Sequence, residues 1–272
     1  MRRGLVSLLV MGGLAYVAAG CQLGVLERWR EVGKIPRPSI EGATAVGSQI
    51  CAACHPNQIE TFKQTVHARL AGFERGGALE GCEACHGPGS LHVKGGGDRT
   101  KIITFTKLSA SEKESRSEVC LTCHRGRPHL AWRGSVHPLN GVACTDCHTL
   151  MKPAPKLLAR AEPEVCLQCH RERQAELNFP SRHPIREGKI RCSDCHNPHG
   201  SETKKLVKAA TVNQLCVSCH AEKEGPFLFE HPPVTESCTL CHSPHGTTAN
   251  NLLVQNVPFL CLQCHPSHVR CA

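Results

Sequence analysis

Two cysteines and a histidine recur along this chain at a spacing that suits covalent haem attachment. The stretch from Cys192 to His196 reads C-S-D-C-H, and in a C-x-x-C-H motif each thiol can bond one haem vinyl group. The histidine that follows can then bind the haem iron as its proximal ligand. A single motif would be a moderate signal, but this sequence contains nine.

We number these copies motif 1 to motif 9 in chain order. Zinc knuckles would need further ligands to complete each site, and they would not place a histidine directly after every second cysteine. A disulfide framework would not explain the histidines at all. The sequence therefore predicts a protein with nine covalently bound haems. The candidate attachment residues are Cys51, Cys54, Cys82, Cys85, Cys120, Cys123, Cys144, Cys147, Cys166, Cys169, Cys192, Cys195, Cys216, Cys219, Cys238, Cys241, Cys261 and Cys264, and the candidate proximal ligands are His55, His86, His124, His148, His170, His196, His220, His242 and His265.

The remaining histidines equal the motifs in number, and they are candidates for the second ligand of each iron. Met151 is the only methionine after residue 20, so at most one iron could have a methionine ligand. Bis-histidine coordination of all nine haems is the expectation, with low redox potentials because methionine ligands raise them. A surface or hydrogen-bonding role stays open for each of these histidines, above all for His129 in its basic segment. The candidate distal ligands are His67, His92, His129, His137, His183, His199, His231, His245 and His268.

The spacing of these histidines constrains which haem each can reach. His199, His245 and His268 follow a motif histidine by three residues, and three residues span at most ~10 Å. They should therefore ligate neighbouring haems. A second group lies 11 to 13 residues after a motif histidine, far enough to reach the opposite face of the same haem: His67, His137, His183 and His231.

From motif 3 onward, two kinds of motif alternate. First-type motifs begin at Cys120, Cys166, Cys216 and Cys261, which are 46, 50 and 45 residues apart. Second-type motifs follow a His-Pro pair and begin at Cys144, Cys192 and Cys238, which are 48 and 46 residues apart. Such an internal repeat of two haems is typical of a stacked array rather than of one globular core.

The elements that position the motifs should be short. Apolar residues at helical spacing predict a helix over 57–70. Ser109 or Ser111 could cap a helix that runs to Cys120, and Thr211 could cap one that leads to Cys216. With 24 Gly and 18 Pro, the rest should be turns and loops. We expect a multihaem cytochrome c fold of irregular loops and a few short α-helices, in which the haems replace much of the usual core.

The amino terminus predicts export. Residues 1–20 carry two arginines and then an apolar run that is too short for the ~20 residues that span a bilayer, as in a secretory signal. Cys21 follows small residues that resemble a lipoprotein cleavage box, which predicts a lipid on Cys21 that attaches the protein to the outer membrane in the periplasm. An ordinary signal cleaved near Ala19 is the alternative. The predicted organisation is a signal over 1–20, a tether over 21–49 and a nine-haem domain over 50–272.

The formal charge of +9 does not indicate nucleic-acid binding. Arg2 and Arg3 belong to the predicted signal, and the two propionates of each haem would outweigh the positive charge that remains. Lysine and arginine are therefore expected to pair with propionates and to solvate the surface, and no nucleic-acid partner is predicted.

Several stretches resemble the decahaem cytochromes of the DmsE, MtrA and PioA type. They are G-C-E-A-C-H-G-P-G-S-L-H-V, V-A-C-T-D-C-H, H-P-I-R-E-G-K-I-R-C-S-D-C-H-N-P-H-G-S, C-H-A-E-K-E-G-P-F-L-F-E-H and C-T-L-C-H-S-P-H-G. The similarity runs from about residue 47 to residue 265. Those cytochromes continue to a tenth haem, whereas this sequence has nine motifs and ends at Ala272. Whether this is a natural nine-haem form or a truncated reading frame stays open.

The resemblance implies a periplasmic electron carrier at the outer membrane. Its partners would be a periplasmic or inner-membrane cytochrome and, beyond these, an outer-membrane β-barrel and an extracellular cytochrome. A lipid-tethered or soluble periplasmic shuttle to a terminal reductase is the alternative. A haem enzyme is disfavoured, because the sequence has no C-x-x-C-K motif and its one tyrosine, Tyr16, lies in the predicted signal.

Overall fold

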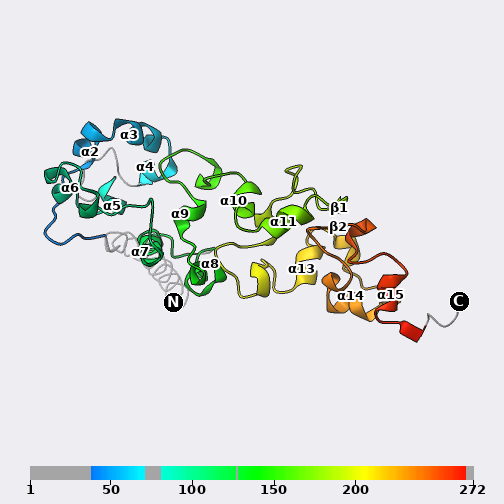
Figure 1. Cartoon of the computed structure of the whole chain (residues 1–272). Coiled ribbons are helices and arrows are strands. Elements are labelled where there is room, and N and C mark those ends of the chain that lie inside the picture. The colour runs from blue at the N-terminus through cyan, green and yellow to red at the C-terminus, as the bar shows by residue number, and fades with distance from the viewer. Residues whose placement is uncertain (1–37, 71–80, 127, 268–272) are drawn as a thin grey trace, which may run out of the picture.

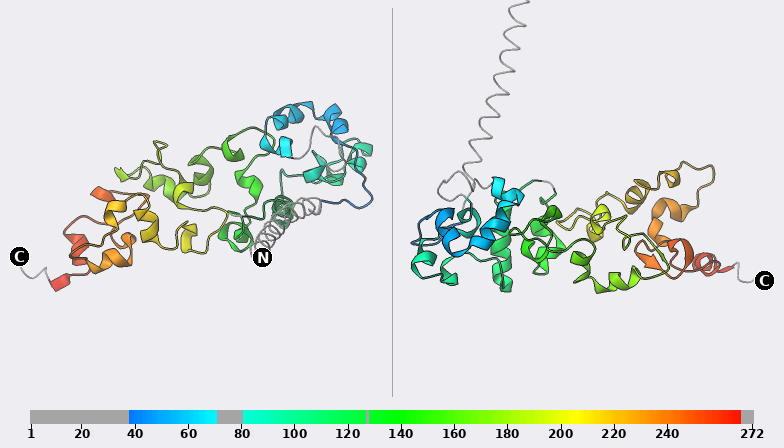
Figure 2. Two further views of the ribbon diagram at one scale, coloured as in Figure 1. Left: turned by 180° about the vertical axis from the view of Figure 1, so that it is seen from behind. Right: turned by 90° about the horizontal axis from the view of Figure 1, so that it is seen from above.

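The computed structural model describes residues 38–70, 81–126 and 128–267. The molecule is elongated, and the chain runs from one end of it to the other. The motifs therefore follow one another in chain order along the long axis (Figures 1 and 2). The predicted signal, Cys21 and His268 lie outside the described residues.

Short helices joined by loops make up nearly all of the structure. The α-helices are α2 (Ser48–Cys54), α3 (Pro56–Lys63), α4 (Val66–Leu70), α5 (Glu83–His86), α6 (Ser90–Lys94), α7 (Ala110–Leu121), α8 (Val136–Leu139), α9 (Cys144–Cys147), α10 (Glu164–Leu167), α11 (Arg171–Glu176), α12 (Cys192–Cys195), α13 (Val212–Val217), α14 (Pro232–Glu236) and α15 (Phe259–Leu262). The 3-10 helices are η1 (Arg99–Lys101), η2 (Trp132–Gly134), η3 (Pro155–Leu157), η4 (Lys204–Leu206), η5 (Ala221–Lys223), η6 (Cys238–Leu240) and η7 (Asn250–Leu252). The expected fold class, a multihaem cytochrome c with a few short helices and mostly loops, is confirmed.

Two helices that lead into first-type motifs, α7 and α13, begin at the predicted caps. The Ser109 hydroxyl accepts from the backbone N–H of Glu112, whose carboxylate accepts from the Ser109 N–H. Thr211 and Gln214 form the same reciprocal pair ahead of α13. Such capping boxes satisfy two amide groups that a helix start would otherwise leave unpaired. Both predicted helix starts are confirmed, with Ser109 rather than Ser111 as the first cap.

The helix predicted over 57–70 is interrupted. It divides into α3 and α4, and the chain turns at Gln64 and Thr65. Ile59 and Phe62 are buried as their spacing predicts, whereas Val66 is 56% exposed. The buried Thr65 hydroxyl donates to the carbonyl of Phe62, an acceptor that an uninterrupted helix would use for a later amide.

The loop after each of motifs 4, 6 and 8 has one repeated conformation. The motif histidine forms an isolated β-bridge to a residue ten or eleven positions later: His148 to Leu158, His196 to Val207 and His242 to Leu253. Each loop then contains a 3-10 turn with two consecutive residues of left-handed conformation. The residue after the motif histidine donates its N–H to the carbonyl of the second of these two residues. The sequence repeat is therefore a repeat of backbone conformation.

Neighbouring repeats join through close backbone contacts. Strands β1 (Ser181–Arg182) and β2 (Gly246–Thr247) pair antiparallel, with Arg182 opposite Gly246. A Cβ atom on Gly246 would overlap the carbonyl of Glu176, and one on Gly200 would lie 2.7 Å from the Ala131 carbonyl oxygen. Glycine is thus required where the loops after motifs 6 and 8 pack against earlier segments.

No helix among the described residues is long and apolar enough to cross a membrane. The buried apolar side chains are few and scattered along the array, among them Leu121, Trp132 and Leu177. Within the described residues these side chains form no single core, which agrees with an architecture that bound haem would complete.

Candidate haem-binding sites

Each motif adopts one helical turn that presents its cysteines and histidine together. In all nine motifs the backbone N–H of the histidine donates to the carbonyl of the first cysteine, over 2.9 to 3.1 Å. This five-residue turn places the two cysteines three positions apart on one side of the turn, as two thioether bonds to one haem require. The nine C-x-x-C-H motifs therefore share one backbone geometry, which suits the haem attachment that the sequence predicts.

The first cysteines of paired motifs lie side by side. The Cys51 and Cys82 thiols are in hydrogen-bonding contact, which raises the pKa of Cys51 and lowers that of Cys82 to about 6. The same contact recurs three times: Cys120 with Cys144, Cys166 with Cys192 and Cys216 with Cys238. Motifs 1 and 2 thus form a pair like the later pairs, which extends the alternation to the start of the array.

Successive pairs also approach one another. The Cys144 contact and burial chiefly raise the pKa of Cys120 of motif 3, and Cys85 of motif 2 adds to the rise. Burial chiefly raises the pKa of Cys147 of motif 4, and Cys169 of motif 5 adds to the rise. Burial likewise raises the pKa of Cys195 of motif 6, with a contribution from Cys219 of motif 7. Since unit charges interact over only short distances in a screened medium, these motifs are neighbours in space. The attachment points run in chain order from motif 1 to motif 8.

In each of the four pairs of motifs, a side chain just before the first motif holds the second. The Ser48 hydroxyl accepts from the N–H of Cys82, and the Ser117 hydroxyl accepts from that of Cys144. The Asn213 side-chain oxygen accepts from the N–H of Cys238. All three lie three residues before a first cysteine. Sequence analysis missed these residues, although their constant offset was a usable signal.

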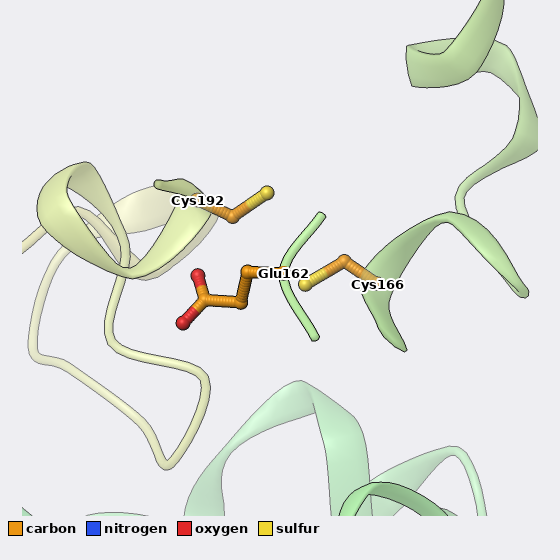
Figure 3. Close-up of side chains that lie close together, drawn as sticks. All are labelled: Glu162, Cys166 and Cys192. Carbon is orange, nitrogen blue, oxygen red and sulfur yellow. The ribbon is translucent and has the colours of Figure 1, made fainter. Parts of the chain in front are cut away.

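In the third pair a glutamate has this role. Both carboxylate oxygens of Glu162 accept from Ser193, one from its N–H and one from its hydroxyl, each over 2.8 Å. Glu162 also lies close to Cys166 and Cys192, and the three could in principle hold a metal ion (Figure 3). Because both thiols belong to haem-attachment motifs and the carboxylate is already bonded, we assign Glu162 to holding motif 6 against motif 5.

The imidazole rings form pairs that fit an iron between them. A metal–histidine bond of about 2 Å and the distance from ring nitrogen to ring centre place two opposite ligands with their centres roughly 6 Å apart. The observed pairs are His55 with His92 at 6.3 Å, His67 with His124 at 6.0 Å, His137 with His170 at 6.2 Å, His148 with His199 at 5.9 Å, His183 with His220 at 6.3 Å, His196 with His245 at 6.1 Å and His231 with His265 at 6.1 Å. Each pair joins one motif histidine to one of the candidate distal histidines.

Hydrogen bonds at Nδ1 leave the other ring nitrogen for the iron. His137 Nδ1 lies 2.7 Å from the Pro198 carbonyl oxygen, and His183 Nδ1 lies 2.6 Å from that of Pro244. Carbonyl partners likewise hold His86, His92, His148, His196 and His242. A carbonyl at Nδ1 fixes the proton there, so that Nε2 is the free donor, as is usual for histidines that bind metal.

Burial keeps several of these rings neutral. Burial and the nearby His129 and His148 rings lower the pKa of His199 to about 4. Burial also lowers the pKa of His67, His86 and His245. Neutral imidazole is the form that binds metal, so the donor set fits haem iron near neutral pH.

The pairing corrects one prediction and supports another. His67, His137, His183 and His231 do not lie opposite the motif histidine that precedes them; each lies opposite that of the next first-type motif. The local assignment was wrong because contour length limits how far a histidine can reach but not in which direction. For His137 and His183, the carbonyls of Pro198 and Pro244 hold the ring toward the later motif. His199 and His245 lie opposite motifs 4 and 6, which agrees with the expectation that they ligate neighbouring haems.

Three described histidines stand outside these pairs. The His129 ring lies 5.1 Å from that of His124 and 4.4 Å from that of His199, and both of those rings already have partners. His86 contacts the Phe105 ring at 5.2 Å, and no described histidine lies opposite it. The same holds for His242 among the described residues.

Comparison with known proteins gives matches along most of the chain. The doubled CXXCH motif family matches residues 183–225 and 231–270, and the NrfB-like cytochrome c-type protein family matches residues 82–162. The chain is 42% identical over 225 residues to a protein from Shewanella baltica (strain OS185) named multiheme cytochrome MtrA. The match covers 81% of this chain and 67% of that protein.

Proposed function

The chain belongs to the MtrA-like multihaem c-type cytochromes, and on that premise we propose that it relays electrons along nine covalently bound haems. Haem supplies reversible one-electron chemistry at its iron. The protein's part is to attach, ligate and space the haems. The resemblance in sequence first implied this role, and the relative's name supports it.

The observation that carries the proposal is the order of the attachment sites. Successive motifs follow one another along the long axis of the molecule (Figures 1 and 2), and thiols of consecutive motifs from motif 1 to motif 8 affect one another's pKa. Histidine pairs cross-link the same array, since each described pair other than His55–His92 joins segments two motifs apart. Such an arrangement holds redox centres in one continuous row and fixes their spacing.

We propose bis-histidine coordination wherever a pair is observed. A six-coordinate iron has no open position for a substrate, which favours a carrier over a reductase. Direction is then set by the donor and acceptor, because similarly ligated sites permit transfer either way. A reductase with an open iron is the rival, and carbon monoxide distinguishes the two, since it binds only where a ligand position is free.

We further propose that the protein works outside the cytoplasm, between a periplasmic or inner-membrane cytochrome and an acceptor at or beyond the outer membrane. The predicted export signal and Cys21 favour anchoring at the outer membrane. An outer-membrane β-barrel and an extracellular cytochrome are the partners that we propose for a transmembrane conduit. A tethered or soluble periplasmic shuttle needs neither.

The decisive experiment uses the intact protein from membranes. Mass spectrometry of the mature chain should show nine haem additions. If a barrel copurifies, both proteins are reconstituted in liposomes, with a reductant outside and a redox dye inside. Dye reduction that requires both proteins supports the conduit. Rapid exchange with soluble carriers and no barrel partner supports the shuttle, and substantial carbon monoxide binding at several haems contradicts the carrier proposal.

A further inference from the structure

The histidine pairs follow two rules that depend on the type of motif. A histidine that follows motif 3, 5 or 7 lies opposite the motif histidine of the next first-type motif. A histidine three residues after motif 6 or 8 lies opposite that of the previous second-type motif: His199 opposite His148, and His245 opposite His196. The second rule identifies what should lie opposite motif 2.

That position is three residues after the motif 4 histidine, and it is occupied by Met151. Motifs 6 and 8 continue as N-P-H and S-P-H, whereas motif 4 continues as T-L-M. Methionine sulfur is an alternative axial ligand of haem iron, and it raises the redox potential. From this correspondence we infer that Met151 is the distal ligand of the haem at motif 2, opposite His86.

The backbone after motif 4 supports the correspondence. The Thr149 N–H donates to the Leu157 carbonyl over 2.7 Å, in the same way as Asn197 to Leu206 and Ser243 to Leu252. The loop after motif 4 is one residue shorter, as its β-bridge from His148 to Leu158 shows. Since all three loops start alike at the residue after the histidine, we place the shortening after Met151, and position three is retained.

His86 can bind a metal through Nε2, but no histidine in the described part of the chain lies opposite its ring. The Ile103 carbonyl oxygen lies 2.7 Å from His86 Nδ1, which leaves Nε2 free to bind iron. His129 is the rival ligand, but its ring contacts those of His124 and His199, which belong to motif 3 and motif 4 sites. Met151 is half-buried and belongs to the motif that the second rule relates to motif 2.

A second correspondence comes from the residue before the ligand. Pro198 and Pro244 each offer a carbonyl to a histidine that pairs with a first-type motif, His137 and His183. The equivalent residue after motif 4 is Leu150, and the equivalent histidine is His67. His67 Nδ1 is buried and has no hydrogen-bond partner among the described residues. Leu150 would supply the missing acceptor when Met151 binds, so that one dipeptide completes two sites.

The inference rests on haem attachment as proposed above, and it predicts one haem unlike the others. We would compare the full-length holoprotein with Met151→Leu, which removes the sulfur, and Met151→His, which restores the pattern of the other repeats. The oxidised wild type should show the near-infrared sulfur-to-iron charge-transfer band and one haem of distinctly higher potential. Both features should vanish in Met151→Leu and Met151→His, with nine haems still present by mass.

Two further variants identify the haem. Replacing Cys82 and Cys85 by alanine should remove one haem and abolish the charge-transfer band, while His129→Ala should retain the band. Absence of the band in the wild type, or its persistence in Met151→Leu or without the motif 2 haem, would overturn the inference and leave the nine-haem relay intact. Loss of haem from the wild type's mass would instead contradict the proposed function itself.

Discussion

The imidazole of His183 lies 6.3 Å from that of His220, 37 residues later in the chain. The Pro244 carbonyl oxygen lies 2.6 Å from His183 Nδ1. The site at motif 7 therefore uses a residue that precedes its own cysteines. His183→Ala should open the iron of motif 7 and not that of motif 5. The expected result is a new high-spin signal and carbon monoxide binding at one haem.

A double substitution assigns the opened iron. In the His183→Ala background, replacing Cys216 and Cys219 by alanine should remove the high-spin signal together with one haem. Replacing Cys166 and Cys169 instead should leave that signal in place. The reverse pattern would mean that His183 ligates the haem at motif 5.

A glycine substitution tests the contact between repeats. Gly200 has φ +116°, and an added Cβ would lie 2.7 Å from the Ala131 carbonyl oxygen. Gly200→Ala should cost about 1–3 kcal/mol from backbone strain alone, and more from the clash. Gly126→Ala is the matched control, because its Cβ would meet nothing within 4 Å and its φ is not positive. Thermal unfolding should separate the two variants; equal midpoints would contradict the packing described here.

The carboxylate of Glu176 should tune the haem at motif 6. His245 Nδ1 lies 3.2 Å from Glu176 Oε2, and a carboxylate at that nitrogen makes the imidazole a more basic ligand. A more basic ligand stabilises the oxidised iron. Glu176→Gln should therefore shift one potential upward, on the order of tens of millivolts. Potentiometric titration would measure the shift.

Glu172→Gln is the control for this effect. Glu172 Oε1 lies 3.7 Å from His170 Nδ1, beyond hydrogen-bond distance, so its removal should shift the potential at motif 5 much less. A larger shift in Glu172→Gln than in Glu176→Gln would show that net charge, and not the hydrogen bond, sets the potential.

The sequence predicted the parts of this molecule that depend on neighbouring residues. Motif spacing predicted the attachment residues, whose backbone forms the same turn in every motif, and capping patterns identified Ser109 and Thr211. Distal pairing depends on contacts between distant segments, such as His137 with the Pro198 carbonyl 61 residues later, and contour length alone cannot choose among the haems within reach. Glu162 was missed for a similar reason, because its role exists only once motif 6 lies against motif 5.

Export and lipidation remain predictions for Cys21. Cells fed a labelled fatty acid should incorporate label into the wild type but not into Cys21→Ala, which should be released from membranes with its haems attached. Cys271→Ala is a matched control, because it removes the other cysteine that belongs to no motif. Equal labelling of wild type and Cys21→Ala would rule out lipid attachment at Cys21.

Relay along the row can be tested by placing an electron trap within it. His137 lies 6.2 Å from His170, so His137→Met should keep two ligands at motif 5 while raising that potential. Motif 5 lies between motifs 4 and 6 in the row of thiols. Electrons that pass from end to end should therefore dwell there, and transfer through reconstituted liposomes should slow.

His231→Met makes the same ligand change at motif 9, where His231 faces His265. If motif 9 donates to the acceptor, a trap there slows release, whereas if it receives electrons, a trap there speeds entry. The central trap should slow transfer whichever way the row is driven. Unchanged transfer in His137→Met, with the potential shift verified by titration, would show that electrons bypass motif 5 and that the row is not the path.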